Sequence, residues 1–433
     1  MDLLTANDRP GEYPPSYYAE TAKHLDRFPN AAGDLTCDVC VVGGGFTGMS
    51  TAYHLAQRGY DVVLLEAQRV GFGASGRNGG QVSTGQRRDQ DELEEMVGDA
   101  HARDLWDIGC QAVDLVRDLC GTDAVHTDFY PGIVHTVHRA RDHKHNQAYA
   151  DHMQSKYGYD KISVLEPDAC RAIVNSPAYH GGTLDMGSGH VNPLELVFGL
   201  VRLAVAAGAR VFEGSKVLNI AEGDPATVTT DQAVIKARYV VLGCNGYLGN
   251  MQKHVAARVM PINNFIVATA PMSPDAQEDI IRHNYAVADS KFVVNYFRFS
   301  DDQRLLFGGT ESYGYKFPKD IAANVRKPLT QIFPQLKNVE IDHAWGGTLG
   351  ITMNRMPHFE RLAGNILTMS GFSGSGVALG TMSGKIAAEA IAGHAENFDV
   401  MARVPTLPFP GGPKLRSPLL VLAMLWYSLR DKL

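Results

Sequence analysis

A glycine-rich turn, Gly43–Gly48, is the sequence feature that most constrains how this chain can fold. It follows the apolar run Asp38–Val42, which is typical of a buried parallel strand, and it opens a helical pattern over Phe46–Arg58. A second apolar run, Asp61–Leu65, then ends at the acidic residue Glu66. A G-x-G-x-x-G motif alone is a weak signal, but this order of strand, turn, helix, strand and acid predicts a Rossmann-type dinucleotide-binding unit.

The residues of this motif have distinct expected roles. Gly43 permits the tight turn, Gly45 lets the backbone approach a pyrophosphate, and Gly48 lets the helix pack closely on the strand. Free N–H groups at the start of the helix would hold the anionic pyrophosphate. Glu66 would accept hydrogen bonds from the adenosine ribose, which disfavours a 2'-phosphate. Three neighbours complete the predicted contacts here: Phe46, Thr47 and Ala67.

A second glycine-rich loop, at 71–81, favours FAD over NAD. It lies immediately after the ribose acid and is rich in small residues and hydrogen-bond donors, so it could follow an extended dinucleotide and close on an isoalloxazine ring. The alternative is a mobile surface loop, in which the donors would have no ligand. The predicted contacts are Gly73, Ala74, Ser75, Gly76, Arg77, Asn78, Gly79, Gly80 and Gln81.

The remaining pattern predicts an α/β protein in which a Rossmann-type FAD-binding domain carries an inserted α+β substrate domain built on a mixed or antiparallel sheet. Helical periodicity covers Asp91–Cys120, and alternating apolar residues dominate 263–307. The chain then returns to the nucleotide domain. The predicted division is an N-terminal extension at 1–35, FAD-binding segments at 36–120, 190–250 and 345–400, substrate segments at 121–189 and 251–344, and a C-terminal extension at 401–433.

Composition excludes several other classes of protein. Asp and Glu outnumber Lys and Arg by 47 to 40, so we expect no nucleic-acid partner. The acidic, proline-containing start lacks the pattern of a secretory signal, which favours a cytoplasmic protein. Pro418–Leu429 is too short to span a bilayer and predicts a packed helix. Cys37 and Cys40 form a C-x-x-C, but Cys40 lies inside the first strand, so we expect no metal site.

The chain resembles the D-amino-acid-oxidase-like FAD oxidoreductases, which include sarcosine and glycine oxidases. The resemblance starts with the nucleotide motifs described above and extends over nearly the whole chain. Its further motifs are Ser16-Tyr17-Tyr18-Ala19, Arg304-Leu305-Leu306-Phe307-Gly308-Gly309, Phe333-Pro334-Gln335-Leu336-Lys337, Arg355-Met356-Pro357, Pro408-Phe409-Pro410-Gly411-Gly412 and Tyr427-Ser428-Leu429-Arg430-Asp431. It implies two lobes, FAD bound in an extended form, and oxidation of an amine to an imine that water hydrolyses to an aldehyde.

The resemblance also implies further cofactor contacts. The turn before the last helix would lie at the pyrimidine edge of the flavin, where N–H groups stabilise negative charge on the reduced ring. No cysteine follows Cys244, so we expect FAD to be bound non-covalently. The residues of this turn are Gly371, Phe372, Ser373, Gly374, Ser375, Gly376 and Val377, and the remaining predicted FAD contacts are Val217, Gly243 and Asn245.

Four residues are candidates for the substrate site. Oxidation of a C–N bond needs a neutral amine, so the pocket must lower the amine pKa by burial or offer a base. His190, in a turn that faces the flavin if the family topology holds, is the candidate base. Tyr296 and Arg298 alternate on a strand and could line the pocket, and Trp345 could form a wall. The alternative for each residue is a role in packing alone.

Within the family, the motifs favour oxidation of a gamma-glutamyl-blocked polyamine such as gamma-glutamylputrescine. One alternative is an N-methyl amino acid oxidase, which would need an Arg and a Lys to grip a carboxylate. A second is a non-catalytic FAD-binding subunit of a larger flavin complex. The predicted partners are therefore a small-molecule amine and either oxygen or another electron acceptor. Lys291 is a candidate for activating oxygen.

Overall fold

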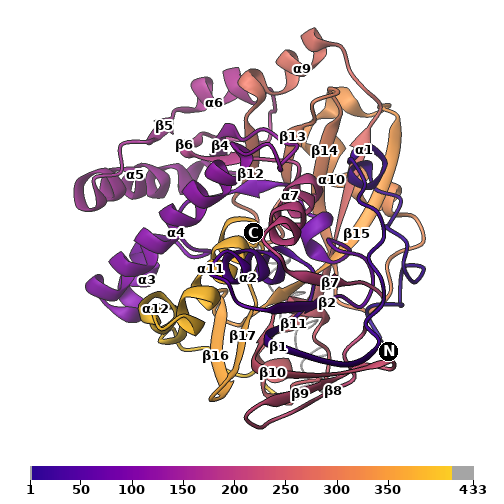
Figure 1. Cartoon of the computed structure of the whole chain (residues 1–433). Helices are drawn as coiled ribbons and strands as arrows, with labels where there is room; N and C mark the ends of the chain where they lie inside the picture. Colours follow the sequence, from indigo (N-terminus) through magenta and orange to yellow (C-terminus); the bar gives the residue numbers. More distant parts are fainter. Residues whose placement is uncertain (1, 412–433) are drawn as a thin grey trace.

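The computed structural model describes residues 2–411, so the predicted helix at Pro418–Leu429 lies outside the described residues. Two sheets organise this part of the chain (Figure 1). The first has the order β16-β17-β10-β1-β2-β7, with β9 beside β10 and β8 beside β9. Its strands are β1 (Gly33–Val42), β2 (Val62–Leu65), β7 (Arg210–Phe212), β8 (Asn219–Ala221), β9 (Ala226–Thr229), β10 (Ala233–Leu242), β16 (His358–Ala363) and β17 (Ile366–Ser370).

Parallel pairing in the first sheet brings the nucleotide motifs to one edge. Val41 is level with Leu64 of β2 and with Val241 of β10. The turns that follow these three strands therefore meet at their carboxyl ends. The strand order also reverses between β1 and β10, and ligands of open α/β sheets bind at such a switch point. The Rossmann-type unit predicted from the sequence is confirmed.

Three helices cover one face of the first sheet (Figure 1). They are α2 (Phe46–Ala56), α7 (Pro193–Ala206) and α11 (Ala378–Ile391), and α2 packs against both of the others. The contact with α11 is unusually close, because a Cβ added at Gly384 would lie 2.4 Å from the carbonyl oxygen of Thr47. This glycine therefore lets the last long helix reach the start of α2.

The second sheet is mixed, as predicted, with the order β15-β11-β14-β13-β12-β4-β6-β3 and β5 beside β6. Only β4 and β12 pair in parallel among its named strands. Its strands are β3 (Gln81–Val82), β4 (Tyr130–Thr136), β5 (Ile162–Leu165), β6 (Gly182–His190), β11 (Met260–Thr269), β12 (Ala286–Asp289), β13 (Tyr296–Phe299), β14 (Leu305–Ser312) and β15 (Ile341–Ile351).

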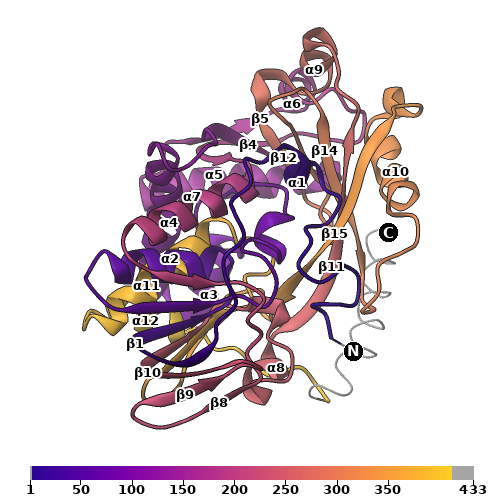
Figure 2. The ribbon, with the colours of Figure 1, turned by 45° about the vertical axis from the view of Figure 1, so that its right-hand side comes forward.

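The remaining helices flank the two sheets (Figures 1 and 2). The helical pattern predicted for Asp91–Cys120 forms two helices, because Gly98 adopts φ 83° between them. The helices are α1 (Tyr17–Thr21), α3 (Gln90–Val97), α4 (Asp99–Cys120), α5 (His143–Tyr157), α6 (Pro167–Ile173), α8 (Lys253–Arg258), α9 (Pro274–Ile280), α10 (Ile321–Ile332) and α12 (Glu396–Ala402).

The switch back from the second sheet to the first comes later than the predicted boundary at 344/345. Residues 345–351 continue β15, which pairs with β11 over Ile341–Ile351. A Cβ at Gly346 would lie 2.7 Å from the Phe317 ring, so this glycine makes room for aromatic packing and does not end the strand. Gln81 and Val82 also join the second sheet, through β6. The placement of 345–351 in the FAD-binding segment is therefore corrected.

Candidate functional site

The carboxyl edge of the first sheet borders a cavity of about 660 Å³. Its walls come from the glycine turn after β1, the acid after β2, the loop at 73–75 and the turn after β10. Leu3 and Leu4 of the N-terminal segment also line it. Ten of the predicted cofactor contacts border this cavity: Gly43, Gly45, Glu66, Ala67, Gly73, Ala74, Ser75, Val217, Gly243 and Asn245.

The glycine turn is shaped so that side chains would block it. Gly43 adopts φ 105°, and a Cβ at Gly48 would lie 1.9 Å from the Gly43 carbonyl oxygen. A Cβ at Gly45 would lie 2.7 Å from the Ser75 hydroxyl, which accepts a hydrogen bond from the Phe46 N–H at 3.0 Å. The turn thus offers exposed backbone at the start of α2, which is the geometry that a pyrophosphate needs. Thr47 and Gly48 lie within α2 itself.

Glu66, the predicted ribose-binding acid, lines this cavity. Its carboxylate accepts hydrogen bonds from the Gly44 N–H at 2.6 Å and from the Gln68 N–H at 2.8 Å. Burial raises the pKa of Glu66 to about 7, and the two backbone donors oppose this shift. The remaining acceptor capacity of the carboxylate suits the two ribose hydroxyls of an adenosine.

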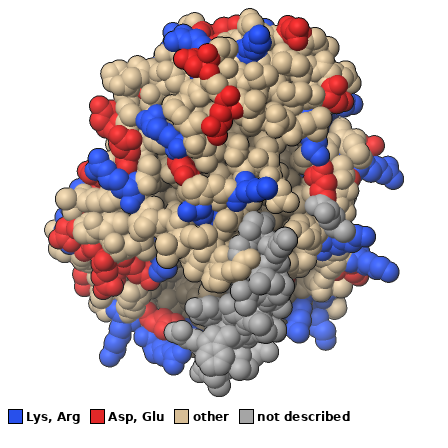
Figure 3. Space-filling model, turned by 90° about the horizontal axis from the view of Figure 1, so that it is seen from below, with Lys and Arg blue, Asp and Glu red and all other residues tan. Residues whose placement is uncertain are grey.

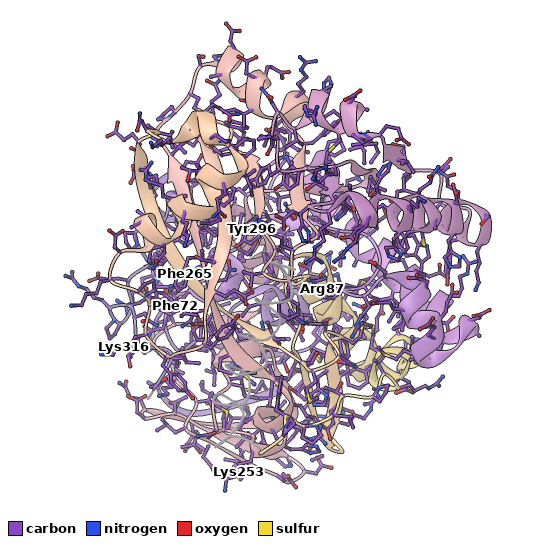
Figure 4. The ribbon with its side chains drawn as sticks, turned by 180° about the vertical axis from the view of Figure 1, so that it is seen from behind. Phe72, Arg87, Lys253, Phe265, Tyr296 and Lys316 are labelled. Atoms are coloured by element: carbon purple, nitrogen blue, oxygen red, sulfur yellow. The ribbon has the colours of Figure 1, made fainter. Side chains whose placement is uncertain are left out.

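A second cavity, of about 570 Å³, is bordered by the second sheet and by the turn before α11, and Ala74 lines both cavities. An extended dinucleotide can therefore pass from one cavity to the other along the loop at 73–81. The second cavity is bordered by eight further predicted cofactor contacts: Arg77, Asn78, Gly79, Gln81, Ser373, Gly374, Ser375 and Val377. Figure 4 shows two of its lining residues, Arg87 and Tyr296, in the interior of the molecule, with Lys253 and Lys316 at its periphery.

The donor side chains of the loop bind mainly to the protein. The Arg77 guanidinium donates to the carbonyl oxygens of Phe72 at 2.6 Å and Gly346 at 3.1 Å, and it pairs with Asp8 at 2.9 Å. Asn78 donates to the carbonyl oxygens of Ala74 and Ser75. These contacts hold the loop in shape, so its backbone and small side chains form the surface beside the cavities. Gly76 and Gly80 allow close approach to Gly71 and Val191.

The turn before α11 is tied to the turn after β10. Gly371 adopts φ 77° and its N–H donates to the Asn245 side-chain oxygen at 2.9 Å. Ser373 and Gly374 also have positive φ, and the Ser373 carbonyl oxygen accepts from Arg87 at 3.0 Å. Burial lowers the pKa of Arg87, and the neighbouring Arg355 adds to this effect. Phe372 and Gly376 complete this turn at the start of α11.

Of the four predicted substrate residues, Tyr296 lines the second cavity. Its hydroxyl donates to the Asn264 side-chain oxygen, and burial raises the pKa of this phenol. His190, Arg298 and Trp345 are not among the described residues that line these two cavities.

These three side chains are bonded to main-chain carbonyls. His190 Nε2 donates to Asn284 at 2.8 Å, its ring stacks on Tyr130, and burial lowers its pKa to about 3, so the imidazole is neutral. Arg298 donates to the carbonyl oxygens of Gly79, Val191 and Phe299 at 2.8, 2.9 and 3.1 Å. The Trp345 indole donates to the carbonyl oxygen of Arg77 at 3.0 Å.

Several charged residues of the second cavity were not predicted from the sequence, and Arg87, Glu311 and Arg355 are among them. Glu311 extends from β14, accepts from the Tyr313 hydroxyl at 3.2 Å, and has its pKa raised by burial. Arg355 adopts φ 67° and lies over the Phe292 ring at 5.1 Å. Lys291, a predicted residue, also lines this cavity. The cavity therefore combines cations with carboxylates, which include Glu311, Asp185 and Asp289.

Two further properties concern residues 2–411. No group of three or more His, Cys, Asp or Glu side chains in this part of the chain could hold a metal ion. None of its helices is both long and apolar enough to cross a membrane. On the face seen from below, acidic and basic side chains are interspersed (Figure 3).

Comparisons with known proteins agree with this geometry. The family model "FAD dependent oxidoreductase" (DAO) matches residues 38–390. A probable oxidoreductase OrdL of Rhizobium meliloti is 40% identical over 418 residues, which cover 96% of this chain and 97% of the relative. Gamma-glutamylputrescine oxidoreductase of Escherichia coli is 39% identical over 423 residues, which cover 98% of this chain and 99% of the relative. The crystal structure of glycine oxidase from Geobacillus kaustophilus has a TM-score of 0.70 at 19% identity, covering 83% of this chain and 95% of that one.

Proposed function

Because the chain belongs to the DAO family of FAD-dependent oxidoreductases, we propose that it oxidises the C–N bond of a gamma-glutamyl-blocked polyamine such as gamma-glutamylputrescine. The product would be an imine, which water hydrolyses to an aldehyde. Bound FAD supplies the acceptor for the hydride that leaves the carbon next to nitrogen. Similarity to the Escherichia coli enzyme over almost the whole of both chains supports this choice of substrate.

The observation that carries the proposal is the mixed charge of the second cavity. A gamma-glutamyl head has a carboxylate and an ammonium on the same carbon, and Arg87, Glu311 and Arg355 line the same cavity. We assign the guanidinium groups to the carboxylate and Glu311 to the ammonium. Binding the head at a distance from the reacting amine would contribute energy for positioning the reacting carbon.

The reacting amine would be held at the part of the cavity near Tyr296. The Tyr296 hydroxyl donates to Asn264, so its oxygen can accept a hydrogen bond from the amine. Removal from water favours the neutral form of the amine, because burial penalises the charged ammonium. The neutral form is the one that can lose a hydride.

A second candidate is an N-methyl amino acid oxidase. It is favoured by one observation, which is that Arg87 and Lys291 line the same cavity and could grip a carboxylate together. The non-catalytic alternative would leave the flavin unreduced by every amine. We also propose a cytoplasmic location. The six cysteines support this location because all of them are free thiols.

The test is anaerobic reduction of the flavin by gamma-glutamylputrescine, putrescine and sarcosine on one preparation. We expect gamma-glutamylputrescine to be fastest at saturation, putrescine to be much slower because it lacks the head, and sarcosine to be slowest. If sarcosine reduces the flavin fastest, this proposal is wrong and the N-methyl amino acid oxidase hypothesis replaces it. Absence of bleaching with all three would favour a non-catalytic subunit.

Two variants test separately the binding of the gamma-glutamyl head and the reoxidation of the flavin. Glu311→Gln should raise KM for gamma-glutamylputrescine and leave KM for putrescine nearly unchanged, whereas Glu12→Gln, at an exposed acid paired with Arg9, should change neither. If oxygen reoxidises the flavin, Lys291→Met should slow turnover with oxygen more than turnover with an artificial acceptor. An equal effect on both would remove Lys291 from that role.

A further inference from the structure

The N-terminal segment, residues 2–11, closes one side of the dinucleotide cavity. Leu3 and Leu4 line this cavity together with Glu66 and Val217, so two apolar side chains stand at its adenosine end. Both leucines are partly buried even though they lie near the chain end.

The segment is fastened next to the ribose-binding acid. The Gln68 side chain donates to the Leu4 carbonyl oxygen at 2.9 Å and accepts from the Gly11 N–H at 2.6 Å. The backbone N–H of the same Gln68 donates to Glu66 at 2.8 Å. Gln68 is 5% exposed, so these bonds are sheltered from water. One side chain therefore fixes both ends of the stretch from Leu4 to Gly11.

A second set of contacts fastens the segment to the substrate lobe. The Asn7 side chain donates to the Tyr315 carbonyl oxygen and accepts from the Phe317 N–H, each at 2.8 Å. Asp8 pairs at 2.9 Å with Arg77, whose side chain is 1% exposed. An ion pair this deeply buried is costly to break from one side, because the remaining charge stays unpaired. The segment is thus bonded to the loop that runs between the two cavities.

We propose that residues 2–11 form part of the FAD site, with Leu3 and Leu4 packing against the adenosine half and the segment retaining the bound cofactor. Bonds at Gln68, Asn7 and Asp8 hold the two leucines in place before the cofactor arrives, which lowers the entropy lost on binding. Release of FAD would then require the segment to move. The inference depends on FAD binding and not on the identity of the substrate.

The double variant Leu3→Ser/Leu4→Ser in the full chain tests whether these two side chains pack against the adenosine half of FAD. We expect the Kd for FAD, measured by titrating the deflavinated protein and following flavin fluorescence, to rise at least about tenfold. Asn7→Ala keeps Leu3 and Leu4 but removes the hydrogen bonds of Asn7 to Tyr315 and Phe317, so it should weaken FAD binding by a smaller factor. Leu407→Ser is the matched control, because Leu407 is 65% exposed and lies outside the cavity.

Hydrogen exchange on the unaltered protein gives an independent readout. FAD should slow exchange of the amides at 3–11, including the Gly11 N–H that bonds to Gln68. The proposal is overturned if the double leucine variant and the Leu407 variant bind FAD equally well. It is also overturned if FAD leaves exchange at 3–11 unchanged. Since neither measurement involves an amine, failure here is distinct from failure of the proposed substrate.

Discussion

Replacing Glu66 by glutamine should change cofactor affinity and apoprotein stability in opposite directions. The glutamine oxygen can still accept from the Gly44 N–H, but the charge-assisted bond that we expect Glu66 to make with a ribose hydroxyl would be lost. We expect FAD to bind about tenfold more weakly, which corresponds to about 1.4 kcal/mol. The same change removes a carboxylate whose pKa burial raises from 4.5 to about 7.

The sign of the stability effect follows from that pKa. The folded apoprotein holds the proton on Glu66 up to about pH 7, whereas the unfolded chain releases it near pH 4.5. The contribution of Glu66 to the free energy of unfolding of the apoprotein is therefore fully present below pH 4.5. It is lost as the pH rises towards 7. The loss has an upper bound of about 3 kcal/mol at 1.4 kcal/mol per tenfold change in proton affinity. Because Glu66 is partly exposed beside the cavity, we expect roughly half of this.

The assay is urea unfolding of deflavinated Glu66→Gln and parent protein at pH 5 and pH 8, together with FAD titrations at pH 8. The variant should be more stable than the parent at pH 8 and nearly equal to it at pH 5. Glu12→Gln, at an exposed acid, controls for loss of a negative charge. The reasoning about Glu66 is refuted if the variant binds FAD as tightly as the parent. It is also refuted if the difference in unfolding free energy, variant minus parent, is smaller at pH 8 than at pH 5.

Three other outcomes are expected. Acid precipitation should release FAD into the supernatant, because no cysteine lines the second cavity; flavin that stays in the pellet would contradict non-covalent binding. Gly48→Ala should raise the FAD Kd at least about tenfold, since its Cβ would lie 1.9 Å from a carbonyl oxygen, whereas Gly364→Ala, with nothing within 4 Å, should not. Arg298→Met should lower the free energy of unfolding by roughly 3 kcal/mol, because three buried carbonyls lose a charged donor, and an unchanged melting temperature would refute that role.

The nucleotide-binding half of the fold could be predicted because its determinants are local. The strand, turn, helix and second strand of the first unit lie within 38–66, and each step depends on neighbouring residues. The acid Glu66 follows the second strand directly, so parallel pairing must bring it beside the turn after the first. Periodicity and glycine placement were therefore sufficient.

The end of the second sheet could not be predicted in the same way. Whether 341–351 is a strand of that sheet depends on pairing with β11, which lies about 80 residues earlier in the chain. The predicted boundary at 344/345 separated Gly346 and Gly347 from this sheet, but in the structure both glycines lie within β15 and make room for Phe317 and Arg77. Only the packed partner shows that small residues are needed there.

The second cavity was the least predictable part. Arg87, Glu311 and Arg355 belong to three segments that are far apart in sequence, and the second sheet brings them together. A signal for Glu311 existed, since it is an acid that continues the apolar run of β14, but the pattern does not tell which cavity the carboxylate faces. His190 was selected as a titratable residue in a turn expected to face the flavin, and neither ground predicts that its ring already donates to the carbonyl oxygen of Asn284.

Two residues selected for the substrate site, Arg298 and Trp345, act on the loop between the cavities. Arg298 binds the carbonyl oxygen of Gly79, and Trp345 binds that of Arg77. Asp8 pairs with the Arg77 side chain from the N-terminal segment. The loop is therefore held from the second sheet and from the N-terminal segment, while its glycines leave its backbone free to border both cavities. A substitution at any of these anchors should consequently alter FAD binding and amine oxidation together, whereas one at Glu311 should affect the amine alone.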